Sequence, residues 1–321
     1  MSDISQQLKQ IVGERMKEQE PMSRHTNFRI GGPARWFVEV RTLNELRQIL
    51  DLAHQNKIAV FVMGGGSNTL VSDEGFDGMV IQMAMRGIRI EGTTAQAEAG
   101  VLSAALARAT AQAGLSGFTW AISLPGTIGG AVRGNAGCFG GETKDHLVEA
   151  MVLRNGEIRT LSKSDLQFGY RESAIKHSSD IVLSATFSFK SGDSVALQAD
   201  LEYKLSSRKS SQPLDAGSAG CLFKNYEVIS EDELQRLQQK FDIPSEMSQA
   251  RRISAGWLID QLDLKGKQIG GAKISDKHGN FVVNTGTATA DDVVQLIALI
   301  KTRARNELGV FLREEVELVG F

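Results

Sequence analysis

A stretch of fifteen residues, Ser123-Leu-Pro-Gly-Thr-Ile-Gly-Gly-Ala-Val-Arg-Gly-Asn-Ala-Gly137, constrains the fold of this chain more than any other segment. Five of its residues are glycine, which reaches positive φ and admits close approach of another group where a Cβ would collide. Successive exposed N–H groups in such a segment can form an anion-binding nest, above all where a helix begins. We call this segment the second glycine loop (residues 123–137), because another glycine-rich loop precedes it in the chain. Taken alone, it has two possible interpretations: an elaborate turn without a ligand, or a cradle for a diphosphate.

The first glycine loop (residues 64–68) has the sequence Gly64-Gly-Gly-Ser-Asn68 and follows an apolar segment, residues 59–63, that we predict to be a short buried strand. It lacks the Gly-Lys-Ser/Thr ending of a P-loop, and its glycine spacing is not that of a Rossmann fingerprint. A structural turn would explain this loop by itself. Two glycine-rich loops that each close an apolar segment favour a bound dinucleotide or a similar diphosphate ligand.

Composition restricts the class of protein. A length of 321 residues predicts two or three domains, and 41% apolar with 23% charged residues is typical of a soluble globular protein. The net charge of −2 gives no reason to expect nucleic acid or an anionic membrane as a partner. The two cysteines, Cys138 and Cys221, indicate a reducing compartment rather than a disulfide framework. No apolar run approaches the roughly 18 residues of a membrane span, and the N-terminus does not resemble a signal peptide. We therefore expect a cytoplasmic enzyme.

Periodicity and capping signals predict an α+β chain with many short strands and no regular βαβ alternation. Apolar residues at helical spacing predict an amphipathic helix over residues 4–18, and Thr42 with Glu45 predicts a helix start. Asn155-Gly156 between two apolar segments predicts a β-hairpin. The polar segment 206–213 is the best candidate for a domain boundary. We also expect helices over residues 101–113, over residues 250–261 and after Thr289, and a final strand over residues 312–319.

Seven segments, in this order, resemble the UDP-N-acetylenolpyruvoylglucosamine reductase family, flavoproteins of bacterial peptidoglycan synthesis. The segments are His25-Thr-Asn-Phe-Arg-Ile-Gly-Gly32, Gly64-Gly-Gly-Ser-Asn68, Ser123-Leu-Pro-Gly-Thr-Ile-Gly-Gly130, Tyr170-Arg-Glu-Ser173, Ala219-Gly-Cys-Leu-Phe-Lys-Asn225, Ser254-Ala-Gly-Trp-Leu-Ile-Asp-Gln261 and Leu312-Arg-Glu-Glu-Val316. The two glycine loops alone would indicate only the wider superfamily of FAD proteins that share this binding fold. The last three segments make the resemblance specific to the reductases.

The resemblance implies a two-lobed FAD-binding domain of the PCMH/vanillyl-alcohol-oxidase-like type, followed by a smaller α+β substrate domain. We place the two FAD-binding lobes at residues 1–78 and 79–207 and the substrate domain at residues 208–321. Related oxidases often attach the flavin to a histidine in the first glycine loop, and this loop has none, so non-covalent FAD is expected. The residues implied to bind FAD are Gly64, Gly65, Gly66, Ser67, Asn68, Ser123, Pro125, Gly126, Thr127, Gly129, Gly130 and Ala131.

The reaction implied by the resemblance has two halves. NADPH reduces FAD, and the reduced flavin gives a hydride to the enolpyruvyl double bond of a UDP-sugar, which yields UDP-N-acetylmuramate. No fingerprint for NADPH is visible in the sequence, and we expect a monomer that binds neither nucleic acid nor membrane. Two other functions stay open: an FAD-dependent oxidase of the same superfamily acting on an alcohol or sugar, and a nucleotide-binding module without catalysis.

Three residues are implied to carry the chemistry. Arg171 matches the family's active-site arginine, and its guanidinium fork suits a carboxylate, although a lone arginine in a polar loop is ordinarily a surface residue. Glu315 precedes the valine as the family's catalytic glutamate does; strand alternation would put it on the face opposite Glu314. We expect Glu315 to act protonated, with its pKa raised by burial, the alternative being a solvated acid at the edge of a sheet.

Cys221 stands where many relatives carry serine as the proton donor. A thiol, with a reference pKa of about 8.5, gives up its proton more readily near neutral pH than a hydroxyl does. The alternative is that a buried cysteine behaves as a small apolar residue.

Lys224, Asn225 and Gln261 match positions near the substrate in the family, although Lys224 would also be ordinary as an exposed lysine. His278 lies in a predicted turn and is expected to be structural. No cluster of His, Cys and Asp has the spacing of metal ligands, so no metal is expected. Only eight residues separate Arg171 from Asp180, which indicates the shorter form of the family, without an inserted loop that closes over the substrate.

Overall fold

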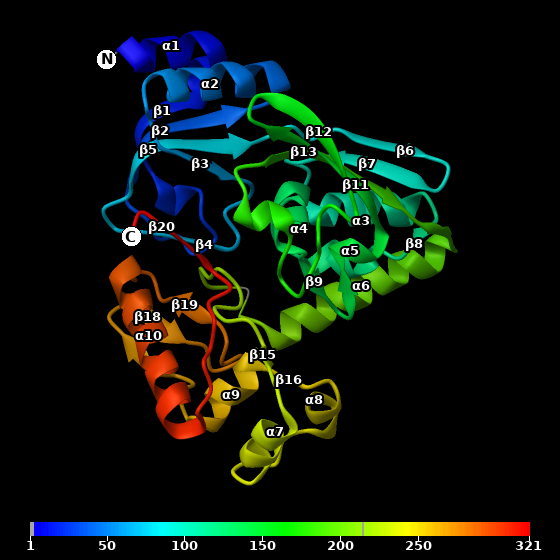
Figure 1. Ribbon diagram of the computed structural model, residues 1–321, viewed down its shortest axis with the longest axis vertical. Coiled ribbons are helices and arrows are strands. Elements are labelled where there is room, and N and C mark those ends of the chain that lie inside the picture. Colours follow the sequence, from blue (N-terminus) through cyan, green and yellow to red (C-terminus); the bar gives the residue numbers. More distant parts are fainter. Residues whose placement is uncertain (1–2, 214) are drawn as a thin grey trace. The chain divides into compact units, whose positions relative to one another are not determined.

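The computed structural model describes residues 3–213 and 215–321 and contains two compact units (Figure 1). Unit 1 consists of the described residues up to Glu20 together with Pro33–Gly66 and Phe76–Ser210. Unit 2 consists of Pro21–Gly32, Ser67–Gly75 and the described residues from Ser211 onward. The chain therefore passes from one unit to the other several times, once inside the first glycine loop. The predicted division into two flavin lobes and a substrate domain concerns binding roles and stays a prediction.

A four-stranded sheet in unit 1 has the order β1-β2-β5-β3. Its strands are β1 (Met16–Pro21), β2 (Pro33–Val40), β3 (Val60–Met63) and β5 (Phe76–Met83). Both β2 and β3 run parallel to β5. Helices α1 (Asp3–Val12) and α2 (Leu43–Gln55) lie together along this sheet (Figure 1). The predicted cap of α2 is confirmed, because the Thr42 side chain accepts a hydrogen bond from the Glu45 N–H.

A five-stranded antiparallel sheet in unit 1 has the order β12-β11-β13-β7-β6. Its strands are β6 (Ile88–Glu91), β7 (Thr94–Glu98), β11 (Leu147–Arg154), β12 (Glu157–Ser162) and β13 (Ile181–Ser188). The predicted hairpin is confirmed: Asn155 and Gly156 have φ of 51° and 81° and join β11 to β12. Positive φ at both central residues matches the twist of the flanking strands, which is why Asn-Gly is favoured there.

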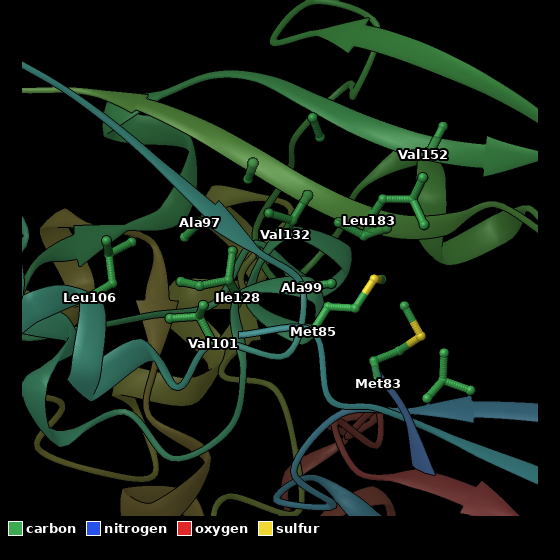
Figure 2. Packing of buried hydrophobic residues seen from close by; sticks show 14 of the residues in the cluster. Met83, Met85, Ala97, Ala99, Val101, Leu106, Ile128, Val132, Val152 and Leu183 are labelled. Carbon is green, nitrogen blue, oxygen red and sulfur yellow. The ribbon is translucent and has the colours of Figure 1, made fainter. Parts of the chain in front are cut away.

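Smaller elements complete unit 1. They are η1 (Gly13–Arg15), α3 (Ser103–Gln112), β8 (Leu115–Ser116), η3 (Thr119–Ser123), α4 (Ile128–Gly134), β9 (Gly137–Cys138), β10 (Gly141–Glu142), α5 (Thr143–His146), η4 (Ala174–His177), β14 (Lys190–Ser191) and α6 (Ser194–Ser211). Figure 2 shows how α4 enters the hydrophobic core: its residues Ile128 and Val132 lie among Ala97, Ala99 and Leu183. Both α4 side chains are fully buried, so the helix within the second glycine loop is anchored in the core of unit 1.

Unit 2 is built from short strands and helices around a hydrophobic core of its own. An antiparallel sheet has the order β17-β18-β19, and β20 pairs parallel with β4. The longest described helix of unit 2 is α10. It begins after Thr289, whose side chain accepts a hydrogen bond from the Asp292 N–H, and this confirms the predicted start. The elements are η2 (Met22–Arg24), β4 (Thr69–Val71), β15 (Tyr226–Glu227), α7 (Glu231–Gln238), α8 (Ser245–Gln249), β16 (Arg252–Ile253), α9 (Ala255–Gln261), β17 (Gln268–Ile269), β18 (Ala272–Ile274), β19 (Val282–Asn284), α10 (Ala290–Arg303), η5 (Ala304–Leu308) and β20 (Glu317–Val319).

Three predicted elements are wrong in extent. The helix expected over residues 4–18 ends at Val12, because Gly13 has φ of 62° and the chain then enters β1. The helix expected over residues 250–261 starts only at Ala255, since Arg251 has φ of 48° and the next two residues pair with β15. The final strand covers only β20 rather than residues 312–319. The polar segment 206–213 contains the last turns of α6, and the division between the two units falls within it, after Ser210.

Candidate active site

The two glycine loops meet in unit 1. Strand β3 ends at Met63, and the next residue, Gly64, lies so close to Thr127 of the second glycine loop that a Cβ on Gly64 would collide with the threonine hydroxyl. A Cβ on Gly65 would lie 3.4 Å from the Cα of Gly126. Glycine is therefore required at position 64 by close approach of another segment rather than by backbone conformation.

The Thr127 hydroxyl is a buried polar group without a partner among the residues that the structure describes. Thr127 is the N-cap residue of α4 and only 5% exposed, yet its side chain makes no capping hydrogen bond. An unsatisfied buried hydroxyl costs about 1–3 kcal/mol, so such groups usually mark a ligand or an ordered water. A diphosphate oxygen would satisfy it, and the glycines bring the two loops together around this hydroxyl. The residues present thus fit the diphosphate of FAD.

The first two N–H groups of α4 are already committed to backbone acceptors. The Ile128 N–H donates to the Val101 carbonyl over 2.8 Å, and the Gly129 N–H donates to the Ala99 carbonyl over 2.9 Å. A Cβ on Gly129 would lie 3.0 Å from that of Ala99, so this glycine lets α4 pack closely on the chain that leaves β7. Gly129 consequently has a clear structural role, and its predicted contact with FAD stays a prediction.

Ser123 begins the second glycine loop beside α6. Its hydroxyl accepts a 3.5 Å hydrogen bond from Nη1 of Arg208 and lies 4.0 Å from Sγ of Cys138. The Cys138 thiol donates to the Trp120 carbonyl over 3.1 Å, and burial raises the pKa of this thiol. Cys138 is therefore held as a neutral, packed thiol. Of the remaining predicted FAD residues, Gly66 and Gly126 have φ of 62° and 105°, and Ala131 is buried.

Arg171 lies in unit 1, beside the end of the second glycine loop. Its Nη2 donates to the Gly137 carbonyl over 2.7 Å, and its guanidinium carbon lies 5.1 Å from the centre of the Tyr170 ring. Its φ of 56° is unusual for a residue other than glycine. Backbone in such a conformation is frequently found at functional sites, where the surrounding structure holds it in place.

Unit 2 brings Cys221 and Glu315 together through their backbones. The Glu315 N–H donates to the carbonyl of Leu222, the residue after Cys221, over 2.7 Å. The Glu315 carbonyl accepts a 2.9 Å hydrogen bond from Nδ2 of Asn68, so the end of the first glycine loop also contacts this segment. Three of the predicted site residues, distant in sequence, are thereby neighbours.

Glu314 and Glu315 are distinguished by their partners. Glu314 forms a 2.6 Å ion pair with Lys301 of α10, and Phe223 pairs with Glu314 in an isolated β-bridge. The argument from continuous strand alternation does not apply, because residues 312–316 are not a continuous strand. The two acids differ instead in their backbone partners: Glu314 pairs with Phe223, whereas Glu315 is bonded to Leu222, the residue directly after Cys221.

The predicted substrate residues follow Cys221 along the chain. The Lys224 N–H donates to the Arg313 carbonyl over 2.9 Å, which places Lys224 next to the Glu315 segment. The side-chain oxygen of Asn225 accepts from the N–H of Ala255, the first residue of α9. Gln261 is exposed at the other end of that helix.

Within residues 3–213 and 215–321, no cluster of three or more His, Cys, Asp and Glu side chains is arranged to hold a metal ion. Burial lowers the pKa of His278, whose ring lies against Gly256, in keeping with a structural residue. None of the described helices combines the length and apolar character needed to cross a membrane.

Comparison with known proteins identifies both parts of the chain. Residues 34–162 match the model of an FAD binding domain, and residues 212–319 match the C-terminal domain of UDP-N-acetylenolpyruvoylglucosamine reductase. A curated reductase of that name from Lactobacillus delbrueckii subsp. bulgaricus is 36% identical over 307 residues, which cover 95% of each chain. This chain belongs to the UDP-N-acetylenolpyruvoylglucosamine reductase family.

Other members of the family support the assignment over nearly the whole length. The reductase of Synechococcus sp. (strain JA-3-3Ab) is 40% identical and aligns with 94% of this chain and 90% of its own. The crystal structure of the Thermus caldophilus reductase superposes with a TM-score of 0.75 at 32% identity, covering 95% of this chain and 99% of that one. The predicted α+β fold, with an FAD-binding domain followed by a reductase C-terminal domain, is confirmed.

The sequence analysis did not single out Asn135, a buried residue close to the segment of Arg171. Asn135 is completely buried at the end of α4 and has φ of 42°, the left-handed conformation of a helix C-cap. Its position directly after Gly134 at the end of a short helical segment was the available signal, because asparagine is one of the few residues that adopt this conformation readily. What its side chain contacts could not be predicted, since its partners are distant in sequence.

Proposed function

We propose that this chain is an FAD-dependent reductase that uses NADPH to convert enolpyruvyl-UDP-N-acetylglucosamine to UDP-N-acetylmuramate, a peptidoglycan precursor. Family membership supports the reaction class, since the curated relatives carry the reductase name over nearly their full length. The observation that carries the proposal is the 2.7 Å hydrogen bond from Glu315 N–H to the Leu222 carbonyl, because it sets the predicted acid beside Cys221. We further propose that the enzyme acts as a monomer in the cytoplasm.

The two glycine loops would hold FAD, with the Thr127 hydroxyl as a donor to the diphosphate. When bound, FAD would supply the redox chemistry by taking a hydride from NADPH and passing it to the terminal carbon of the enolpyruvyl group. The protein has to orient the enolpyruvyl sugar, stabilise charge on its carboxylate and deliver a proton to the carbon next to that carboxylate. The hydride and this proton together convert the double bond to a lactyl ether.

Arg171 would bind the substrate carboxylate, where negative charge develops as the hydride adds. A guanidinium that is already oriented loses little on meeting a carboxylate, and Arg171 is held at its backbone and at Nη2. One well-placed donor to developing charge is worth about 2.7–4 kcal/mol of barrier. Lys224, Asn225 and Gln261 would bind other parts of the UDP-sugar.

Cys221 would donate the proton to the substrate carbon, and Glu315, which we expect to act in its protonated form, would assist from the neighbouring segment of unit 2. A general acid must be protonated at the working pH, which a thiol with an ordinary pKa of about 8.5 is. The backbone around Cys221 is fixed at two further points. Cys221 pairs with Phe281 in a β-bridge, and the Leu222 N–H donates to the Asn280 carbonyl. Such fixation serves an acid whose proton must reach one carbon atom.

Anaerobic half-reactions test the proposal directly. The purified protein is expected to show flavin absorption bands, to bleach when NADPH is added, and to recover its colour when the enolpyruvyl UDP-sugar follows. Reoxidation by oxygen but not by the enolpyruvyl sugar would favour the oxidase alternative. A colourless protein that takes up no FAD on incubation would contradict the proposal and leave a nucleotide-binding module.

A further inference from the structure

The buried side chain of Asn135 joins three segments of unit 1. Its Nδ2 donates to the Gly169 carbonyl over 2.7 Å and to Oε2 of Glu142 over 3.1 Å. Its Oδ1 accepts from the Lys144 N–H over 3.1 Å. Both amide hydrogens and the amide oxygen are thus in use, and the reverse orientation of the amide would place two acceptors against its oxygen. Asn135 is therefore fixed in a single arrangement.

The segment that Asn135 holds is the turn that carries Arg171. Gly169 and Glu172 exchange backbone hydrogen bonds, with Tyr170 and Arg171 at the tip. The Gly169 carbonyl thus accepts from Glu172 within the turn and from Asn135 outside it. Arg171 has φ of 56°, a conformation that an arginine keeps only when its surroundings enforce it.

Three hydrogen bonds attach this turn to the end of the second glycine loop. Besides the bond from Asn135 to Gly169, Nη2 of Arg171 donates to the Gly137 carbonyl, and the hydroxyl of buried Ser173 donates to the Arg133 carbonyl over 2.6 Å. On the loop, these bonds are made by residues 133, 135 and 137, so several points of the turn are attached to one short segment. Among these three bonds, only the one from Asn135 is made to a residue that precedes Arg171 in the turn, namely Gly169.

We infer that Asn135 is a positioning residue for Arg171: it fixes the Tyr170-Arg171 turn on the same segment that begins with the FAD cradle. This inference rests on the proposed function, in which Arg171 binds the substrate carboxylate. Asn135 does not touch the substrate. It keeps the turn that carries the Arg171 guanidinium attached to the second glycine loop. A displacement of about 1 Å in such a group can slow a reaction about 100-fold.

The substitution Asn135→Gly tests the inference cleanly, because glycine keeps the left-handed backbone and removes only the amide. The holoenzyme variant is expected to keep its FAD and to be reduced by NADPH within about twofold of the wild-type rate. Its reoxidation by the enolpyruvyl UDP-sugar should slow about 10–100-fold. Asn155→Gly is the matched control, an asparagine with φ of 51° in an exposed hairpin turn, and should leave both half-reactions unchanged.

A double substitution separates positioning from a general structural effect. In an Arg171→Met background there is no guanidinium to position, so adding Asn135→Gly should slow sugar-dependent reoxidation by no more than about twofold. If the two losses multiply instead, Asn135 does not act through Arg171 and the inference is wrong. Equal slowing of the NADPH half-reaction would likewise contradict it.

Trypsin gives a readout that does not depend on the reaction. The wild-type turn should resist cleavage after Arg171, whereas Asn135→Gly should be cut there at least about tenfold faster, as mass spectrometry of the fragments would show. Unchanged cleavage together with unchanged half-reactions would overturn the inference. If the wild-type enzyme is reduced by NADPH but not reoxidised by the sugar, the proposed function fails. The cleavage assay still tests whether Asn135 holds the Tyr170-Arg171 turn. Should Asn135→Gly not fold, Ser173→Ala removes a second tether of the same turn, and the same split between the half-reactions is expected.

Discussion

At the scale of single residues, the proposed mechanism depends on the thiol of Cys221 as the proton donor. Cys221 sits in a segment whose neighbours are fixed by backbone hydrogen bonds to Asn280 and Glu315. Sequence alone could not separate an acid from a small packed residue at this position. The structure places the backbone of the Cys221 segment next to that of Glu315, which is compatible with the proposed role of Cys221 as proton donor.

Replacing the thiol should affect one half-reaction only. In Cys221→Ala, NADPH should still bleach the flavin, whereas sugar-dependent reoxidation should fall at least about 100-fold because general acid catalysis contributes that much or more. Stopped-flow absorbance of each half-reaction measures this. Survival of both at the wild-type rate would show that Cys221 is not the acid.

The control is Cys221→Ser. Serine keeps a proton-donating group at this position, so the sugar half-reaction of Cys221→Ser should fall less than that of Cys221→Ala.

At the scale of elements, an ion pair joins the end of β11 to the residue before β13, with a half-exposed arginine and a buried aspartate side chain. Arg154 donates from Nε and Nη2 to the two carboxylate oxygens of Asp180 over 2.8 and 2.6 Å. The Asp180 side chain is only 3% exposed. Hydrogen bonding from Arg154 lowers the pKa of this carboxyl group, against the opposing effect of burial. A lowered pKa in the folded state means that the pair stabilises the fold at neutral pH and that this stability is lost as the pH falls through the folded-state pKa.

We expect Asp180→Asn to lower the free energy of unfolding by about 1 kcal/mol at pH 7. The difference from wild type should shrink below pH 3.8, the ordinary pKa of the group, because the wild-type carboxylate is then protonated in the unfolded state and progressively in the folded state. Urea titrations at several pH values measure it. Glu157→Gln, in the exposed pair with Arg159 on β12, should change stability by less than about 0.5 kcal/mol. A difference for Asp180→Asn that stays constant down to pH 2 would contradict the assignment.

At the scale of the whole molecule, local signals in the sequence were sufficient for some features and not for others. The Asn155-Gly156 hairpin and the start of α10 at Thr289 depend on neighbouring residues, and both were predicted correctly. Residues 312–319 follow a strand pattern, but their actual pairing is set by partners at Asn68 and Leu222 that no local pattern reveals. The candidate site was reached through resemblance of motifs. The tether at Asn135 was missed because it consists entirely of contacts between distant segments.

The cap of α10 shows how unit 2 includes early parts of the chain. Asp73 accepts from the N–H groups of Ala290 and Asp291 over 2.8 and 3.1 Å, at the start of the helix. Asp73→Ala should destabilise unit 2 by about 1–2 kcal/mol, as loss of a helix cap does. In hydrogen exchange, peptides from Ser67–Gly75 should lose protection together with α10. Asp77→Ala on β5, an exposed residue of unit 1, should leave both unchanged. Loss of protection in β2 and β5 instead would contradict this grouping.

The pairing of β20 with β4 has a consequence for the time at which the protein can fold during its synthesis. The two strands are separated by about 250 residues, and ribosomes add about 5–20 residues per second, so β4 is complete roughly 12–50 s before its partner exists. Phe28 and Leu70, both fully buried in the core of unit 2, belong to the same early segments. Throughout that interval these apolar side chains lack their native neighbours, which makes the nascent chain a substrate for chaperones until its last strand is made.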